Sequence, residues 1–184
     1  MVNFIKTEIE GVVLIEPKLF RDSRGFFFES YRKDEFSANG IENSFVQDNQ
    51  SLSFYGTVRG LHCQKKGCEQ AKLVRVLQGE ILDVVVDIRK GSPTFGKYLT
   101  FDMSDRNGYQ LFIPGGLLHG FSVLSDTAMC LYKVDNFYCK EAEHSVCPID
   151  SDLGIDWKIP KDKMIISDKD RLGDGFKNVV DNRF

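Results

Sequence analysis

Hydrophobic and polar residues alternate with a period of two along most of this 184-residue chain. Such alternation is typical of strands with one buried face, above all where Val, Ile, Phe and Tyr are frequent. The segments with this pattern are VVLIEPKLF (12–20), ILDVVVDIR (81–89), YLTFDMS (98–104), YQLFIP (109–114) and AMCLYKVDNFY (128–138). Helices are favoured only by YRKDEFSANG (31–40) and CKEAEH (139–144), so a parallel α/β sheet is not expected. The pattern predicts an all-β sandwich or small barrel.

Turn signals separate these segments. Gly79 interrupts one apolar run, and the pair Asn107-Gly108 predicts a tight hairpin turn because both residue types accept positive φ angles. The segment after Trp157 is polar, and we expect it to cover the barrel as loops with little regular structure. Because the chain has no internal repeat and no linker-like stretch, residues 1–184 are expected to form one domain.

Composition narrows the classes of function. Hydrophobic residues make up 42% of the chain, charged residues 28%, and the net charge is −3, which is typical of a globular protein and not of a disordered or membrane protein. Positive charges do not gather, so no nucleic-acid partner is expected. Lys6, Glu8 and Glu10 interrupt the apolar run that a signal peptide needs. Five cysteines without regular spacing are typical of reduced thiols, and together these features predict a cytoplasmic protein.

The fifteen phenylalanines are unusually frequent, and GFFFES (25–30) places three in a row. Alternation prevents three successive side chains from sharing one face of a strand. Two interpretations stay open. Some of these rings cover a second surface, such as a dimer interface or an aromatic ligand slot, or they fill the core of a barrel that is closed on both faces.

Two of the three histidines stand beside glycines, His62 in RGLHCQ and His119 in PGGLLHGF. Taken singly, each could be a hydrogen-bonded core residue. The P-x-G-x-x-H spacing that ends at His119 resembles the second motif of the cupin barrels. In metal cupins the first motif supplies further histidines and a glutamate, because a divalent ion needs three or four donors. Here that motif is reduced to His62, Cys63 and Gln64, with Lys72 nearby, so we expect neither a metal nor another cofactor.

Several motifs in one order resemble the dTDP-4-dehydrorhamnose 3,5-epimerase family. They are FRDSRGFFFESY, FVQDNQSLS, VRGLHCQ, AKLVRVLQGEILDVVVDIRKGSPTFG, IPGGLLHGFSVLS, YKVDNFY, GIDWKIP and ISDKD, and they cover nearly the whole chain. The resemblance implies a cupin fold, that is, a double-stranded β-helix or jelly-roll barrel with a few short helices. It further implies a metal-free homodimer with shared active sites that inverts C3 and C5 of dTDP-4-dehydro-6-deoxy-D-glucose, giving dTDP-4-dehydro-L-rhamnose for dTDP-rhamnose biosynthesis.

The resemblance also assigns roles by position. His62 matches the catalytic base, Asp170 the carboxylate that orients it, Lys72 the cation beside the developing enolate, and Tyr132 the proton donor on the opposite face. Residues that match contacts to the substrate are Arg24, Glu29, Gln47, Asp48, Asn49, Arg59, His119, Tyr138, Glu143 and Lys169. Among these, the arginines suit a diphosphate because a guanidinium binds two oxygens at once, and Tyr138 matches a ring stacked on thymine.

The chain departs from the common family pattern at Cys63, at Thr57 and in GGLLHGF, and these departures affect the expected pocket wall and not the proton-transfer residues. Three alternatives to the double epimerase stay open. The first is an enzyme that inverts one carbon or uses another nucleotide. The second is a metal-dependent cupin with His62 and His119 as ligands, and the third is a sugar-nucleotide binder without catalysis.

Overall fold

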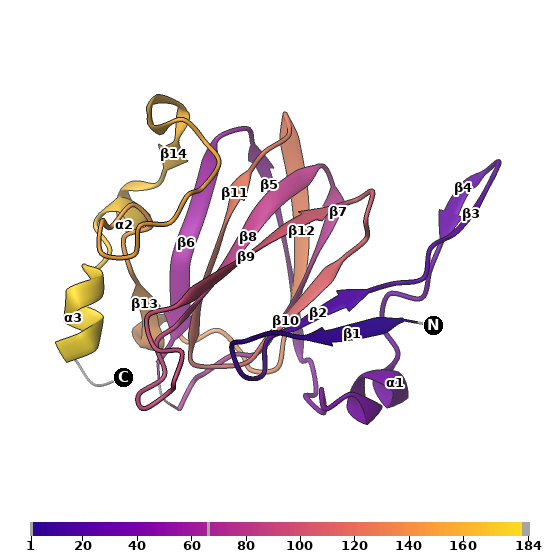
Figure 1. Cartoon of the computed structure of the whole chain (residues 1–184), viewed down its shortest axis with the longest axis horizontal. Helices are drawn as coiled ribbons and strands as arrows, with labels where there is room; N and C mark the ends of the chain where they lie inside the picture. Colours follow the sequence, from indigo (N-terminus) through magenta and orange to yellow (C-terminus); the bar gives the residue numbers. More distant parts are fainter. Residues whose placement is uncertain (1, 66, 182–184) are drawn as a thin grey trace.

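Two antiparallel sheets face each other around a shared core in the computed structural model, which describes residues 2–65 and 67–181 (Figure 1). The first sheet has the strand order β1-β2-β10-β7-β12-β5. Its strands are β1 (Asn3–Lys6), β2 (Val13–Glu16), β10 (Gln110–Ile113), β7 (Lys72–Gln78), β12 (Thr127–Val134) and β5 (Gln47–Phe54). The strand β5 therefore lies at one edge of this sheet.

The second sheet has the strand order β13-β6-β11-β8-β9. Its strands are β13 (Glu143–Ser145), β6 (Thr57–Gln64), β11 (Leu117–Val123), β8 (Glu80–Asp87) and β9 (Tyr98–Ser104). A short strand, β14 (Ile165–Ile166), adds to β6 in parallel. Consecutive strands repeatedly change sheet, which is the arrangement of a jelly-roll barrel, so the predicted all-β cupin fold is confirmed.

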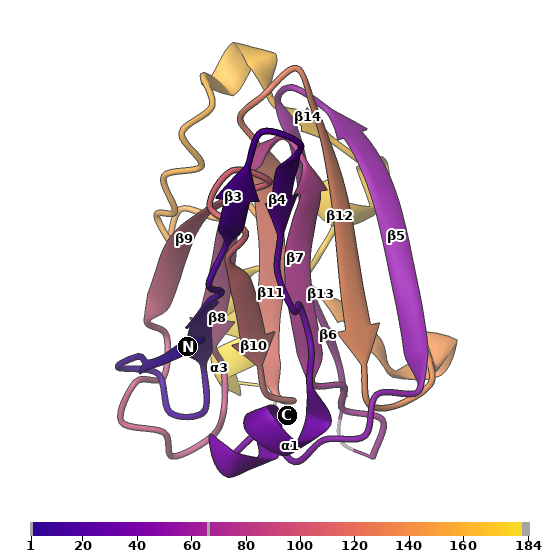
Figure 2. The same ribbon diagram turned by 90° about the vertical axis from the view of Figure 1, so that its right-hand side faces the viewer.

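A separate hairpin of β3 (Phe20–Asp22) and β4 (Gly25–Phe27) extends away from the barrel (Figure 1), and Figure 2 shows it in front of the first sheet. We call residues 20–27 the arm. The helices are short: α1 (Lys33–Ala38), η1 (Lys140–Ala142), η2 (Lys161–Lys163), α2 (Asp168–Arg171) and α3 (Phe176–Asp181). None of the helices in the described part of the chain has the length and hydrophobicity needed to span a bilayer.

The strand β8 explains how the layers hold together, since all but its first residue are buried. Ile81 and Val85 face the space between the two sheets, where they pack with Val74 and Leu111. The alternate residues, Leu82, Val84 and Val86, face outward and pack under the C-terminal segment, against Trp157 and Phe176. Buried apolar surface stabilises a fold by roughly 25 cal/mol per Å², so both faces of this strand contribute.

Two local expectations need correction. Asn107 and Gly108 do not form a two-residue hairpin, because β9 and β10 belong to different sheets. The Asn107 carboxamide oxygen instead accepts the N–H groups of Ser104 and Tyr109, and only Gly108 has a positive φ, of 64°. The segment after Trp157 does cover the barrel, but it contains β14, α2 and α3 as well as loops. Its apolar contacts with the sheet order it despite its polar sequence.

Candidate active site

Two adjoining cavities share His62, Lys72 and Tyr132. The larger, of about 320 Å³, is also lined by Ser51, Arg59, His119, Lys169 and Asp170. The smaller, of about 140 Å³, is also lined by Gln47, Asn49, Cys63, Gln64, Gln70, Tyr138 and Glu143. The structure thus brings together all the site residues predicted from the sequence except Arg24, Glu29 and Asp48.

The two histidines are brought together by the pairing of β6 with β11, in which His62 lies opposite His119. The register shifts between His119 and Phe121, so β6 carries a bulge, and Arg59 and His62 line the same cavity although a regular strand would direct them to opposite faces. Gly60 permits the bulge. Its φ is +117°, and a Cβ there would lie 2.7 Å from Gly120 Cα, so a larger residue would clash with the neighbouring strand.

His62 is held by a buried carboxylate from the C-terminal segment. Its Nε2 lies 2.6 Å from Asp170 Oδ1, and Asp170 Oδ2 accepts the Gly60 N–H at 3.2 Å. The Asp170 N–H in turn donates to Ser167 Oγ, the N-cap of α2. Burial opposes ionisation of Asp170, but these hydrogen bonds outweigh it and hold the pKa of the carboxyl below its usual value. An ionised Asp170 accepts the Nε2–H of His62, which leaves the lone pair on Nδ1.

Lys72 and Tyr132 face the same interior because they occupy equivalent positions in the alternation of β7 and β12. Burial lowers the pKa of Lys72, while the neighbouring Cys63, Asp83 and Glu143 oppose that shift. Burial raises the pKa of Tyr132, and Arg59 opposes the rise. At neutral pH Tyr132 is therefore a protonated phenol that can donate a proton.

A second pair of a histidine and a carboxylate is formed by His119, which lines the larger cavity, and the buried Asp83. His119 Nε2 is 2.9 Å from Asp83 Oδ2, and Asp83, on β8, is completely buried. Burial lowers the pKa of His119, and the Asp83 carboxylate opposes this shift. Sequence reasoning missed Asp83. Its signal was a charged residue at an inward position of the run ILDVVVDI, between the apolar Ile81 and Val85 on the same face.

Tyr138 and Glu143, which line the smaller cavity, form a polar group with Lys169, which lines the larger one. The Tyr138 hydroxyl donates to Glu143 Oε2 at 2.9 Å, and the Lys169 ammonium donates to the same oxygen. Burial opposes ionisation of Glu143, but these two hydrogen bonds lower its pKa overall. The bond to Glu143 raises the pKa of Lys169. Half of the Tyr138 side chain stays exposed, which leaves a ring face accessible to a ligand.

The edge strand β5 presents a polar row to the cavities. Gln47, Asn49 and Ser51 line them, and Ser53 Oγ accepts a hydrogen bond of 2.9 Å from Arg59 Nε. Asp48 points to the other face of β5, where its carboxylate pairs with the Lys133 ammonium at 3.0 Å. Asp48 therefore lies outside these two cavities.

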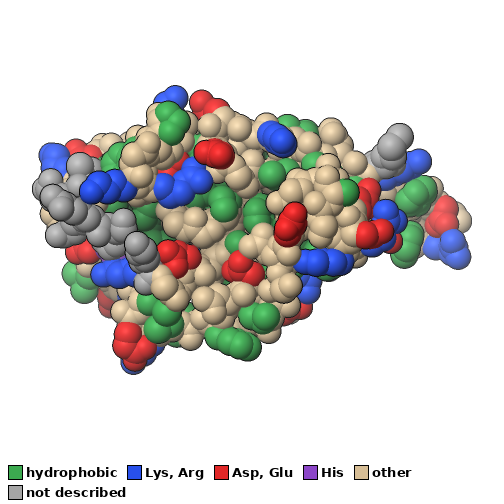
Figure 3. All heavy atoms as spheres, turned by 90° about the horizontal axis from the view of Figure 1, so that it is seen from below, with side chains coloured by type: hydrophobic (Ala, Val, Ile, Leu, Met, Phe, Trp, Pro, Cys, Tyr) green, Lys and Arg blue, Asp and Glu red, His purple; other side chains and the backbone are tan. Residues whose placement is uncertain are grey.

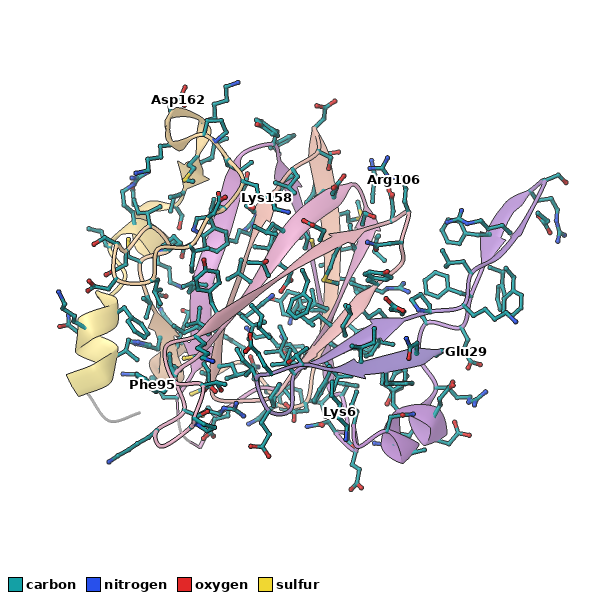
Figure 4. All side chains as sticks on the ribbon, viewed as in Figure 1. Lys6, Glu29, Phe95, Arg106, Lys158 and Asp162 are labelled. Carbon is teal, nitrogen blue, oxygen red and sulfur yellow. The ribbon has the colours of Figure 1, made fainter. Side chains whose placement is uncertain are left out.

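Arg24 and Glu29 also lie outside the two cavities of the site. Arg24 is at the tip of the arm, its side chain is 88% exposed, and among the described residues its ion pair is with Asp22 on the same hairpin, at 2.6 Å. Glu29 follows the arm and contacts Arg32, on the side of the barrel from which the arm extends (Figure 4). The arm of this chain thus extends away from the site of this chain.

The side chains of this site can transfer protons and bind an anion. It contains a carboxylate-held imidazole, a phenol, and cations from Arg59, Lys72 and Lys169. Among residues 2–65 and 67–181, no group of three or more His, Cys, Asp or Glu side chains is placed to hold a metal ion. The fold and the site define a cupin barrel built for acid-base chemistry on an anionic ligand.

Comparison with known proteins shows to which family this cupin barrel belongs. The family model described as dTDP-4-dehydrorhamnose 3,5-epimerase matches residues 6–178. The chain is 49% identical to the dTDP-4-dehydrorhamnose 3,5-epimerase of Shigella flexneri over 95% of this chain and 96% of that protein. It belongs to the dTDP-4-dehydrorhamnose 3,5-epimerase family, so the predicted family and enzyme class are confirmed.

Solved structures of similar proteins point to the same family. The dTDP-4-dehydrorhamnose 3,5-epimerase of Elizabethkingia anophelis superimposes with a TM-score of 0.91 at 49% identity, covering 96% of this chain and 97% of that one. The dTDP-6-deoxy-D-glucose-3,5-epimerase of Legionella pneumophila, solved with dTDP-4-keto-L-rhamnose, gives 0.91 at 43% identity, covering 96% and 94%. Both alignments span the whole barrel, so the resemblance is not limited to isolated motifs.

Proposed function

We propose that the chain inverts C3 and C5 of dTDP-4-dehydro-6-deoxy-D-glucose, giving dTDP-4-dehydro-L-rhamnose in the biosynthesis of dTDP-rhamnose. One observation carries the proposal. An imidazole held by a buried carboxylate, a phenol with a raised pKa and an ammonium group line one cavity. These are the base, the acid and the oxyanion stabiliser that inversion beside a ketone requires.

His62 takes the proton. A C–H next to the 4-keto group is acidic because the charge left behind spreads onto the carbonyl oxygen. With its Nε2–H donated to Asp170, the ring accepts the substrate proton at Nδ1 and becomes an imidazolium. The ionised Asp170, only 7% exposed in its side chain, stabilises that cation at 2.6 Å.

Lys72 and Tyr132 complete each inversion. The Lys72 ammonium stabilises the enolate oxygen, and removing such a donor typically raises the barrier by about 3 kcal/mol. Tyr132 then delivers a proton to the face opposite His62. Its position on β12, across the barrel from β6, supports this role because the two strands belong to facing sheets.

The nucleotide end is bound by the remaining side chains. Arg59 and Lys169 suit the diphosphate, since Arg59 is fixed by Ser53 and Lys169 by Glu143. Gln47, Asn49 and His119 offer hydrogen bonds to the sugar. The exposed ring of Tyr138 suits stacking on the thymine.

The protein acts as a homodimer with shared active sites. Phe26 and Phe27 on the arm are 49% and 71% exposed, and Leu52 and Phe54 on the outer face of β5 are 51% and 64% exposed. Apolar side chains so exposed on an edge strand and a projecting hairpin are typical of an interface. Burying the arm against a second copy would bring Arg24 and Glu29 to the partner's cavity, which explains why they lie far from their own.

The cytoplasm is the compartment that best suits the chain. All five cysteines are free thiols, and reduced thiols are the rule in that compartment. In the view of Figure 3, acidic and basic side chains are interspersed, and this supports the expectation of no nucleic-acid partner.

Deuterium uptake tests the reaction. The purified protein is incubated in D2O with dTDP-4-dehydro-6-deoxy-D-glucose, and the sugar is followed by NMR. We expect deuterium at both C3 and C5, together with the coupling constants of the L-rhamno configuration. Label at one carbon only would identify a single-carbon epimerase, and no label at either carbon would leave a binding protein.

A metal requirement is tested separately. Turnover should be unchanged after dialysis against a chelator, with elemental analysis run on the same sample. Stoichiometric iron, manganese or zinc whose removal abolishes turnover would replace the proposal by a metal-dependent cupin.

A further inference from the structure

The carboxylate that holds His62 is carried by α2, a helix of only four residues. A helix this short is not stable by itself, because the bonds it forms do not offset the cost of starting it. Its orientation is therefore decided by contacts outside the helix and at its ends. Asp170 is the buried residue of this helix, so the side chain that reaches His62 is also the one that the surroundings hold.

Both flanks of α2 are attached to the second sheet (Figure 1). Before the helix, β14 pairs in parallel with β6, and the Ile165 N–H donates to Gly56 O at 2.8 Å. After the helix, the Asp174 N–H donates to Ser145 O on β13 at 2.9 Å. These bonds fix where the segment lies, but neither of them involves the turn that carries Asp170.

Ser167 fixes that turn. It is the N-cap of α2, and its Oγ accepts the N–H of Asp170 at 3.1 Å. The Ser167 carbonyl also accepts the Arg171 N–H at 2.9 Å. One residue thus holds the backbone of Asp170 and of the residue that follows it, which is the usual way in which a capping side chain defines the first turn of a helix.

The spacing from Ser167 to Asp170 is that of a capping box, in which the acidic side chain turns back to the N–H of the cap residue. Here the Asp170 carboxylate is directed elsewhere. Its Oδ1 lies 2.6 Å from His62 Nε2, and its Oδ2 accepts the Gly60 N–H at 3.2 Å. The hydroxyl half of the capping box is kept, whereas the carboxylate half is used for the active site.

We propose that Ser167 is a positioning residue for the pair of His62 and Asp170. By holding the Asp170 N–H, its hydroxyl sets the direction from which the carboxylate meets the imidazole. That direction matters because a carboxylate bound to Nε2–H keeps the ring in the tautomer whose Nδ1 carries the lone pair. Without the cap, α2 can turn between its flanks, and the ring loses its single tautomer. The effect on turnover rests on the proposed function, whereas the effect on the ring does not.

Ser167 also lines the larger cavity, so the experiment must separate positioning from direct contact with the ligand. Loss of a positioning residue lowers kcat and leaves KM nearly unchanged. Loss of a group that binds the substrate and the transition state equally raises KM instead.

Four variants test the role of the hydroxyl. Ser167→Ala and Ser167→Val remove the acceptor, and Ser167→Thr, which has nearly the shape of the valine variant, restores it. The matched control is Ser104→Ala, because Ser104 Oγ accepts the N–H of Asn107, also three residues further on, at 3.2 Å and away from both cavities. We expect Ser167→Ala and Ser167→Val to lower kcat roughly five- to tenfold, the population change that a lost N-cap typically causes. KM should stay near the wild-type value, and Ser167→Thr and Ser104→Ala should keep kcat within about twofold of wild type.

Nitrogen NMR of the three histidines, selectively labelled, reads the positioning directly. The ring signals of His62 are assigned from their loss in His62→Ala. At alkaline pH the wild type should show a protonated Nε2 and an unprotonated Nδ1. Ser167→Ala and Ser167→Val should show a mixture of both tautomers, while Ser167→Thr and Ser104→Ala should keep the wild-type pattern. Urea unfolding of each variant verifies that the barrel is folded.

A wild-type kcat in both Ser167→Ala and Ser167→Val, or a single Nε2–H tautomer in both, would overturn the proposal. A rise in KM at unchanged kcat would make Ser167 a ligand contact instead, and an equal loss of kcat in Ser104→Ala would reduce its role to general stability. Absence of epimerase activity in the wild type would refute the proposed function, and the tautomers would then still decide the positioning role.

Discussion

The functional residues inside the barrel are buried and paired, whereas those on the arm are exposed. In the interior, His62 and His119 lie opposite each other in a paired register, and each contacts a buried carboxylate. On the arm, the Arg24 side chain is 88% exposed and forms an ion pair with Asp22 of the same hairpin. Surface ion pairs of this kind contribute little because water screens them. The interior is thus organised by the fold of one chain, whereas under the proposed dimer the residues of the arm would be held by a second copy.

The largest effect is expected from His62→Ala. Without the imidazole no group in the cavity is positioned to take the substrate proton, so kcat should fall by roughly 10⁴-fold. Initial rates and deuterium uptake at both carbons measure the loss. Binding of dTDP, followed by calorimetry, should be retained, and a variant that still exchanges both protons at the wild-type rate would exclude His62 as the base.

Lys72→Ala should reduce kcat by roughly 10²-fold or more, because the enolate loses its cation. Lys133→Ala is the matched control, since Lys133 lies on the adjacent strand but faces outward to Asp48. Burial lowers the pKa of Lys72, so the wild-type rate should decline on the alkaline side at a pH below the usual 10.5. That decline should disappear in Lys72→Ala, and a decline that persists unchanged would assign it to another group.

Mixing variants tests whether the arm serves a partner. Replacing Arg24 and Glu29 together by Ala should raise KM about tenfold, the effect of losing roughly 1.4 kcal/mol of binding. Mixing this variant with His62→Ala and allowing subunits to exchange should give more activity than the two alone, because one site of each mixed dimer then combines an intact arm with an intact base. Arg106→Ala, another exposed arginine in an ion pair, is the control. If the activity of the mixture only equals the summed activities of the two variants measured alone, the arm acts on the cavity of its own subunit.

The smallest effect concerns the free energy of unfolding of Asp170→Asn, considered apart from the loss of kcat that follows when the carboxylate holding His62 is removed. The pKa of Asp170 is lowered in the folded state, so its contribution is fully present above the unfolded value of 3.8 and is lost as pH falls through the folded pKa. The amide keeps part of the hydrogen bonding, so we expect a loss of about 1 kcal/mol at pH 7. Urea unfolding from pH 7 to 3 should show the two proteins converging at acid pH, and a difference independent of pH would contradict the ionised carboxylate.

Among the strands that carry the site, the edge strand β5 was the hardest to predict. The alternation identified β2, β8, β9, β10 and β12, which contribute apolar side chains to the core. It did not identify β5, where the inward residues Gln47, Asn49 and Ser51 are polar and the outward residues Leu52 and Phe54 are apolar. This reversal follows from function, because the inward face of β5 lines a cavity for a polar ligand.

The order of motifs by itself determined the family and nearly all the residues of the site, because side-chain chemistry at fixed positions is written directly in the chain. Only the tertiary structure decided which residues meet. It placed Asp170 beside His62 from a segment 108 residues away, revealed Asp83 under His119, and turned Asp48 and the arm outward. Convergence of this kind depends on strand register, the bulge at Gly60 and the packing of the C-terminal segment, which are long-range interactions that local pattern does not encode.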